Sequence, residues 1–173
     1  PNILITGTPG TGKSCTCQLL KEATHFTYTN VGEVIRTHEF HAGKDEEFDT
    51  FILDEDSEDS LLDFMEPLMA PGGNIVEFHS CDFFPERWFD LVVVLTTDNT
   101  ILFDRLVKRG YSKHKVEENV QCEIMQVLVS QAYDSYKPEV VQTLKSETID
   151  QLEENVERIA KWIAMFIQAK ASE

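Results

Sequence analysis

The sequence predicts an α/β fold in which a parallel β-sheet lies between two layers of helices. Segments rich in β-branched and apolar residues alternate along the chain with segments of helical periodicity. The run from Leu91 to Leu95 is apolar at every position, which is typical of a strand covered on both faces. The 173 residues, of which 42% are hydrophobic, can bury the core of one domain, and we expect a single domain over residues 1–173.

The first half of the chain begins with a clear strand-turn-helix pattern. Residues 2–6 are an apolar, β-branched run that ends in a Gly/Pro-rich turn, and a helical pattern follows over residues 12–23. Residues 26–28 are a second strand candidate, and Asn30 can cap a helix over residues 31–40. The next segment, up to position 54, is irregular and acidic.

The second half continues the alternation. A helix is predicted over residues 58–69, where a Pro-Gly-Gly turn follows, and the third strand covers residues 74–78. The fourth strand covers 90–95, and a helix then runs from Asp98 or Thr100 to about Arg109. The remaining predicted elements are a helix over 116–136, a strand over 138–144, and an amphipathic helix whose apolar stripe runs from Ile149 to Ile167.

The turn after the first strand carries the most specific motif. Residues 7–14 read Gly-Thr-Pro-Gly-Thr-Gly-Lys-Ser and match G-x-x-x-x-G-K-[ST] in full. Glycines such as Gly10 and Gly12 let backbone N–H groups curl around phosphate oxygens, Lys13 reaches the β and γ oxygens, and the Ser14 hydroxyl binds Mg²⁺. Because the motif follows a predicted strand and opens a predicted helix, the sequence predicts a nucleoside triphosphate site.

A carboxylate at the end of a neighbouring strand is the second part of such a site. Glu77 ends the third strand and is expected to hold the metal ion, directly or through water. His79 lies two residues further on, on the same side of the strand register. It is either a structural histidine or a group that orients the attacking water or the γ-phosphate.

Several further segments make the sequence resemble a known family. Besides the phosphate-binding loop, they are residues 31–33, 52–56, 77–89, 105–111 and 121–124. Together they resemble the nuclear adenylate kinase family that is also implicated in small ribosomal subunit assembly. The resemblance covers nearly the whole chain, and the string from Cys81 to Phe89 is specific because no general fold requirement asks for it.

The resemblance implies a three-layer α/β/α P-loop NTPase fold of the nucleoside monophosphate kinase type, with a five-stranded parallel sheet. It implies an AMP-binding flap over about residues 30–53 and a short lid over about 108–118. ATP would lie on the P-loop with Mg²⁺, and AMP would lie under the flap, with Arg36 and Arg87 on its phosphate.

The same resemblance assigns roles to two more of the five arginines. Arg105 and Arg109 match the family's R-x-x-x-R at the lid entrance, where guanidinium groups clamp transferring phosphoryl oxygens. Three departures stand out: Glu77 replaces the usual Asp, Cys15 replaces a hydroxyl residue, and the lid carries lysines and a histidine rather than further arginines. Slow kinase turnover or partial diversion to ATP hydrolysis is therefore expected, while the Cys15 N–H can still meet a phosphate.

The charge of the chain bears on its partners. Lys and Arg number 15 against 31 Asp and Glu, so the formal net charge is −16, which excludes generic nucleic-acid binding. Nine carboxylates lie between positions 45 and 59. They form either a solvated face or a binding surface for a basic partner. The family resemblance implies that this partner is a basic small-subunit ribosomal protein. No apolar run approaches the length of a membrane span.

Three functions remain open from the sequence. The first is an adenylate kinase, ATP + AMP ⇌ 2 ADP, that also has ATPase activity. The second is mainly an ATPase switch that binds a basic ribosomal protein. The third is an acidic binding module that keeps nucleotide for stability, against which the intact Gly12-Lys13-Ser14 argues. A monomer is expected, and by resemblance alone a nuclear and cytoplasmic location.

Overall fold

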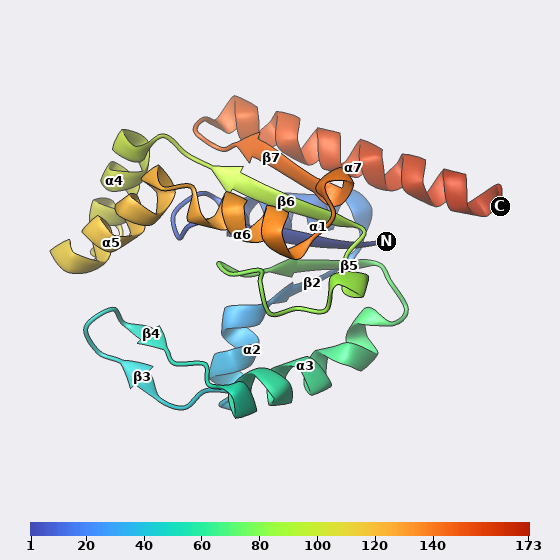
Figure 1. The fold of residues 1–173 in the computed structure, drawn as a ribbon. Coiled ribbons are helices and arrows are strands. Elements are labelled where there is room, and N and C mark those ends of the chain that lie inside the picture. The colour runs from blue at the N-terminus through green and yellow to red at the C-terminus, as the bar shows by residue number, and fades with distance from the viewer.

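A five-stranded parallel sheet forms the centre of the computed structural model, which describes all of residues 1–173 (Figure 1). The strand order is β2-β5-β1-β6-β7, and every pairing in this sheet is parallel. The strands are β1 (Asn2–Thr6), β2 (Thr27–Asn30), β5 (Asn74–Glu77), β6 (Leu91–Thr96) and β7 (Val141–Lys145). The predicted three-layer fold with five parallel strands is confirmed.

Alternate residues of the strands point into two separate cores. Ile3 and Ile5 belong to the cluster under α1 (Lys13–Thr24) and α7 (Ile149–Ala171). Leu4 belongs to the opposite cluster, with residues of α3 (Glu55–Met69) and α6 (Val127–Ser135). This alternation is the two-residue period of a strand covered on both faces.

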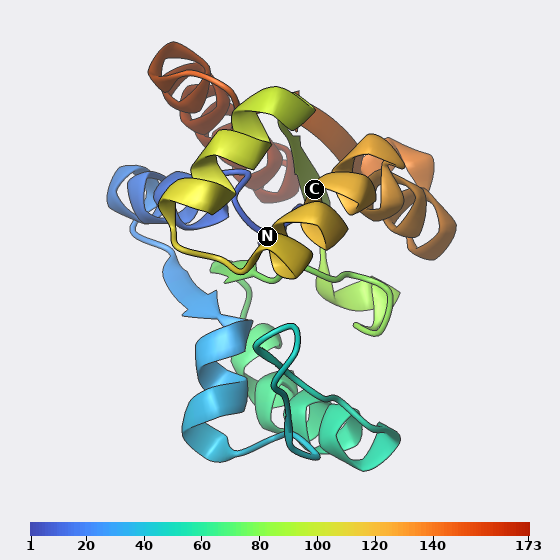
Figure 2. The ribbon, with the colours of Figure 1, turned by 90° about the vertical axis from the view of Figure 1, so that its left-hand side faces the viewer.

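The carboxyl ends of the strands point toward α4 (Asn99–Lys108) and α5 (Lys113–Ile124), at the left of Figure 1. Figure 2 looks onto this edge and shows a lobe set to one side of it. The lobe consists of α2 (Val31–His38), α3 and a hairpin of β3 (Lys44–Asp45) with β4 (Thr50–Phe51). Ligands of open α/β sheets bind outside this edge, so the lobe and α5 flank the expected site.

Two of the predicted helices have different bounds in the structure. The third helix begins at Glu55 rather than 58, because the Asp54 side chain accepts a hydrogen bond from the Ser57 N–H and caps the helix there. The predicted helix over 116–136 is two helices, α5 and α6, because Gln126 adopts a left-handed conformation with φ of 54°.

Two smaller elements were also not predicted. The hairpin of β3 and β4 lies in the segment that was expected to be irregular. The last strand begins at Val141, since residues 138–140 form a turn of 3₁₀ helix.

None of the helices combines the length and apolar character that crossing a membrane requires.

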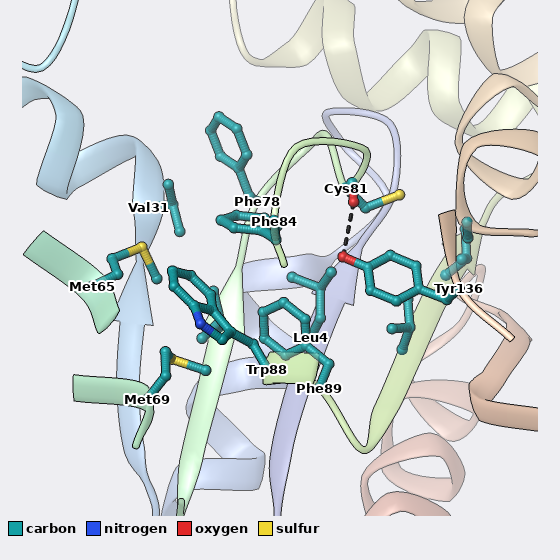
Figure 3. Packing of buried hydrophobic residues seen from close by; sticks show 14 of the residues in the cluster. Leu4, Val31, Met65, Met69, Phe78, Cys81, Phe84, Trp88, Phe89 and Tyr136 are labelled. Carbon is teal, nitrogen blue, oxygen red and sulfur yellow. Dashed lines mark hydrogen bonds between the residues drawn. The ribbon is translucent and has the colours of Figure 1, made fainter. Parts of the chain in front are cut away.

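The aromatic string after β5 packs over the sheet (Figure 3). Phe84, Trp88 and Phe89 are buried and contact one another at ring-centroid distances of 5.6 to 6.3 Å. The Tyr136 hydroxyl donates to the Cys81 carbonyl oxygen at 2.8 Å and fixes the start of the string to α6. The string therefore forms part of the core beside the edge where β5 ends.

Candidate nucleotide-binding site

The loop over residues 7–14 connects β1 to α1 and depends on glycine at two positions. Gly10 has φ of 94°, and a Cβ there would lie 2.8 Å from Leu102 Cδ1. Gly12 has φ of 91°, and a Cβ there would lie 2.9 Å from Ser146 Oγ. Only glycine adopts this backbone at low cost, so the loop can pack tightly against α4 and the end of β7 while its N–H groups remain available for phosphate.

Lys13 is the first residue of α1 and is buried inside the loop. Its Nζ donates to the Gly7 carbonyl at 2.8 Å and to the Thr8 carbonyl at 3.2 Å. Burial lowers its pKa to about 8, an effect that the Glu77 carboxylate partly opposes. The ammonium is therefore still charged at neutral pH. It donates only to neutral carbonyl oxygens, which a negatively charged phosphate oxygen can replace as the acceptor.

Glu77 is buried at the end of β5, with an exposed fraction of 6%. Its Oε1 accepts from Ser14 Oγ at 2.8 Å, while its Oε2 accepts from the Tyr28 hydroxyl and from Asn30 Nδ2, the latter at 3.2 Å. The structure thus brings together the two residues expected to hold the metal ion. Sequence reasoning missed Tyr28 and Asn30, which come from the adjacent strand β2.

The donors at this point fit Mg²⁺. A serine hydroxyl and a carboxylate are hard oxygen ligands, and Mg²⁺ commonly takes one or two protein oxygens and completes its shell with phosphate and water. The structure has no group of three or more His, Cys, Asp or Glu side chains that could hold a metal alone. Ser14 and Glu77 are therefore suited to a metal that arrives with a nucleotide, rather than to a permanent metal centre.

The main cavity, of about 440 Å³, lies between the loop, the lobe and α5. This volume is in the range of small-molecule sites. Most of the predicted site residues line it, together with basic, polar and aromatic groups of the lobe and the lid. The lining includes Gly10, Gly12, Lys13, Ser14, Asn30, Phe48, Thr50, Glu77, Phe78, His79, Arg109, Tyr111, Lys115, Asn119 and Cys122.

His79 lies in the wall of this cavity. His79 is exposed at the cavity surface, but neighbouring protein atoms desolvate its ring. This desolvation, together with the positive charge of Lys13, lowers its pKa to about 4. Its ring contacts that of Phe78 at 4.3 Å between centroids. At neutral pH His79 is therefore an uncharged imidazole that can donate or accept a hydrogen bond in the cavity.

A second cavity, of about 270 Å³, lies on the other side of the loop. It shares Gly10, Gly12 and Arg109 with the main cavity, and Cys15 opens into it. The rest of its lining comes from Arg105 and from the connection between β7 and α7: Ser146, Glu147, Thr148, Ile149 and Leu152. The phosphate-binding loop therefore has a cavity on each side.

Arg105 is engaged by backbone carbonyls behind the loop. Its Nη1 donates to the carbonyls of Gly10 at 3.1 Å and Ser146 at 2.9 Å, and its Nη2 donates to the Glu147 carbonyl at 3.0 Å. It does not line the main cavity, whereas Arg109 does. These bonds fix the loop to the connection after β7, and a role for Arg105 on phosphoryl oxygens stays a prediction.

The two arginines expected to bind AMP lie on the lobe side, outside the lining of the main cavity. Arg36 pairs with Glu33 on α2 at 3.4 Å, and its side chain is 64% exposed. Arg87 forms two hydrogen bonds to the Glu66 carboxylate of α3, at 2.8 and 2.7 Å. Their role as AMP ligands stays a prediction, and Arg87 would have to exchange Glu66 for a phosphate to perform it.

The tip of the hairpin contacts α5 beside the main cavity. Glu47 lies 3.2 Å from His114 Nε2, and Lys115 Nζ donates to the Asp49 carbonyl at 3.4 Å. The ring of Phe48 contacts that of His114 at 5.1 Å between centroids. Sequence reasoning missed this contact, although the hairpin is acidic and the start of α5 carries Lys113, His114 and Lys115.

The fold and this site define a P-loop nucleotide-binding protein of the kinase type. The family described as "AAA domain" matches residues 3–126. The chain is 47% identical to the adenylate kinase isoenzyme 6 homolog of Dictyostelium discoideum, over 94% of this chain and 91% of that protein. The homolog of Drosophila melanogaster is 45% identical, over 96% of this chain and 93% of its own length. The chain belongs to the adenylate kinase isoenzyme 6 family.

Solved structures show the same fold in other kinases. Shikimate kinase from Bacteroides thetaiotaomicron superposes with a TM-score of 0.63 at 15% identity, covering 94% of this chain and 98% of that one. A gluconokinase from Sinorhizobium meliloti superposes with a TM-score of 0.54 at 15% identity, covering 95% of each chain. At this identity the likeness concerns the fold, and the acceptor of the phosphoryl group has to be argued from the site.

Proposed function

We propose that this protein is an adenylate kinase that transfers the γ-phosphoryl group of ATP to AMP and forms two ADP. The observation that carries the proposal is the pair of cavities that share the P-loop and Arg109. In the proposed arrangement the nucleoside of ATP occupies the second cavity, the phosphates follow the loop, and AMP occupies the main cavity. The terminal phosphoryl group then lies where the two cavities meet.

Catalysis in this arrangement is alignment and charge neutralisation, because no side chain needs to be covalently modified. An oxygen of the AMP phosphate attacks the γ-phosphorus, and the bond to the bridging oxygen of ADP breaks. Lys13 and Arg109 neutralise the charge on the transferring oxygens, and the N-terminus of α1 adds its positive dipole. Ser14 and Glu77 would hold Mg²⁺, which neutralises β and γ oxygens when it is bound.

ADP output from ATP, measured with and without AMP, tests the proposal. AMP is expected to raise the output sharply in the wild type, and Lys13→Ala is expected to abolish it. Arg36→Ala is expected to raise the KM for AMP while ATP hydrolysis without AMP stays largely intact. Arg158→Ala, an exposed arginine of α7, is the matched control. If Arg36→Ala reduces AMP-dependent ADP formation and AMP-independent ATP hydrolysis equally, Arg36 of the lobe is not an AMP ligand.

We propose as a second function that the protein hydrolyses ATP as a switch and binds a basic ribosomal protein of the small subunit. Two observations favour it: His79 lines the main cavity as an uncharged imidazole, and carboxylates of the hairpin and of the start of α3 are exposed. The exposed carboxylates in this region are Glu46, Glu47, Asp49, Asp54, Glu55, Asp56 and Asp59.

This second function predicts ATP hydrolysis that is independent of AMP and rises when the basic protein is added. The charge reversal Glu55→Lys with Asp56→Lys is expected to remove that rise. Glu153→Lys with Glu154→Lys, two exposed positions on α7, is the matched control. If ATP hydrolysis by both double variants rises with the basic protein as it does in the wild type, the carboxylates at the start of α3 are not the binding surface for that protein.

A further inference from the structure

The Glu77 carboxylate is held by donors from two different elements. Ser14 of α1 donates to Oε1, and Tyr28 and Asn30 of β2 both donate to Oε2. The strand register explains the second pair: Asn30 lies directly opposite Glu77 in the parallel pairing of β2 with β5. Tyr28 is two residues earlier and so projects on the same side of the sheet.

We propose that Tyr28 and Asn30 are positioning residues that hold the Glu77 carboxylate in the orientation needed for Mg²⁺ at the nucleotide phosphates. The proposal rests on the proposed function, because it concerns the metal that accompanies ATP. Glutamate has one more rotatable bond than aspartate, and ordering its side chain costs more conformational entropy. Two donors on Oε2 restrict the rotation of the Glu77 side chain, while Oε1 accepts from Ser14, and both Ser14 and Glu77 line the main cavity.

The chemistry of the two donors suits this role. The amide of Asn30 has no charge, and the phenol of Tyr28 is an O–H donor that is uncharged at neutral pH. Both groups therefore stabilise the ionised carboxylate without adding a charge that would compete with a cation. A lysine or arginine at either position would pair with Glu77 and weaken its attraction for Mg²⁺.

Tyr28→Phe removes one donor and keeps the ring. The measurement is the calorimetric affinity for ATP over a range of Mg²⁺ concentrations and in EDTA. Loss of a hydrogen bond to a charged group is expected to reduce the Mg²⁺-dependent gain in ATP affinity by about tenfold. The affinity in EDTA is expected to stay within about twofold, since neither the loop nor Lys13 changes.

A matched control separates positioning from general stability. Tyr136→Phe also removes a hydroxyl that donates a buried hydrogen bond, at 2.8 Å to the Cys81 carbonyl, but Tyr136 does not line either cavity. It is expected to lower the unfolding temperature and leave the Mg²⁺ dependence unchanged. Asn30 also caps α2, accepting from the Glu33 N–H at 3.2 Å, so Asn30→Ser keeps a capping oxygen while it removes the amide donor.

The shorter carboxylate provides a second test. In a Glu77→Asp background the carboxylate is withdrawn by one methylene, so Tyr28→Phe is expected to change the Mg²⁺ dependence by less than about twofold. An undiminished effect of Tyr28→Phe in that background overturns the proposal.

The failures of the two proposals are distinguishable. If wild type and Tyr28→Phe show the same Mg²⁺ dependence, positioning is overturned and the proposed function stands. If the wild type itself binds ATP without any dependence on Mg²⁺, the metal site is overturned and positioning with it.

Discussion

Replacing Lys13 with methionine is predicted to stabilise the nucleotide-free protein while it removes nucleotide affinity. The methionine side chain has a similar length and no charge, so it can occupy the same buried space. Wild-type Lys13 remains protonated at neutral pH although its side chain is almost fully buried, with an exposed fraction of 8%. A buried charge without a full ionic partner destabilises the native state.

The magnitude follows from the pKa. Burial lowers the pKa of Lys13 from 10.5 to about 8, which corresponds to about 3 kcal/mol of lost stability when the ammonium stays charged. The hydrogen bonds to the Gly7 and Thr8 carbonyls would be lost in the variant and offset about 1 to 2 kcal/mol of the gain. The net gain is about 1 to 2 kcal/mol, or a rise in Tm of about 5 °C.

The pH dependence of this gain in stability tests whether the buried charge of Lys13 is its cause. At pH 7 Lys13 is charged in both the native and the unfolded protein, so the full penalty applies. As the pH rises through about 8 the native protein loses this proton first, and the penalty disappears toward 10.5. The difference in stability between Lys13→Met and wild type is therefore expected to narrow between these values.

Chemical denaturation at pH 7 and at about pH 10 measures this difference, and calorimetry with Mg²⁺ and ATP measures the affinity. Loss of two charge-assisted hydrogen bonds to phosphate is expected to weaken binding at least about a hundredfold. Lys21→Met, an exposed position on α1, is the control and should change neither quantity. A variant that is less stable than wild type at pH 7, or a gain that does not narrow with pH, refutes the reasoning.

Three further predictions concern the walls of the site. Gly10→Ala is expected to lower the free energy of unfolding by about 1 to 3 kcal/mol in chemical denaturation, because its φ is positive and the new Cβ meets two leucines of α4. Arg105→Met should cost about 2 to 4 kcal/mol in the same experiment, since it breaks the bonds to the loop carbonyls, whereas exposed Arg158→Met should cost little. Desolvation of the ring and the charge of Lys13 hold the pKa of His79 at about 4 in the native protein, against 6.5 in the unfolded protein, so stability should fall as the pH drops from 6.5 toward 4. Between pH 7.5 and pH 5 the Tm of His79→Gln should drop less than the Tm of the wild type, and an equal drop would contradict this.

The parts of the fold that the sequence predicts correctly are those with a local signal. The apolar run of β6 and the Gly-rich turn after β1 identify the sheet and the phosphate-binding loop without any knowledge of distant contacts. The break at Gln126 has no such signal, because the residue is neither glycine nor proline and a left-handed backbone is uncommon for it. The start of α3 had a signal, the capping Asp54, which the acidic run around it obscured.

The residues of the site likewise fall into two groups: those that a local motif predicts, and those that only the folded topology brings together. Lys13 and Ser14 are neighbours within one motif, and their spacing alone indicates phosphate and metal binding. The hydrogen bond between Tyr28 and Glu77 joins residues 49 positions apart, and it depends on the strand order, which places β2 beside β5. The bonds of Arg105 to the segment after β7 likewise span 41 and 42 positions. Contacts of this kind follow from the topology and have no counterpart in residue spacing.

The net charge of −16 and a site for anionic phosphates are compatible because charges act over short distances in salt solution. At physiological ionic strength the Debye length is about 8 Å, so exposed carboxylates that lie farther than this from the phosphates are largely screened from them. The charged side chains that line the cavity are the cations Lys13, Arg109 and Lys115 and the carboxylates Glu77 and Glu118, and screening there is weaker. The field that a nucleotide meets on the P-loop is therefore set by these groups and the N-terminus of α1, while the acidic surface governs which macromolecules approach the protein.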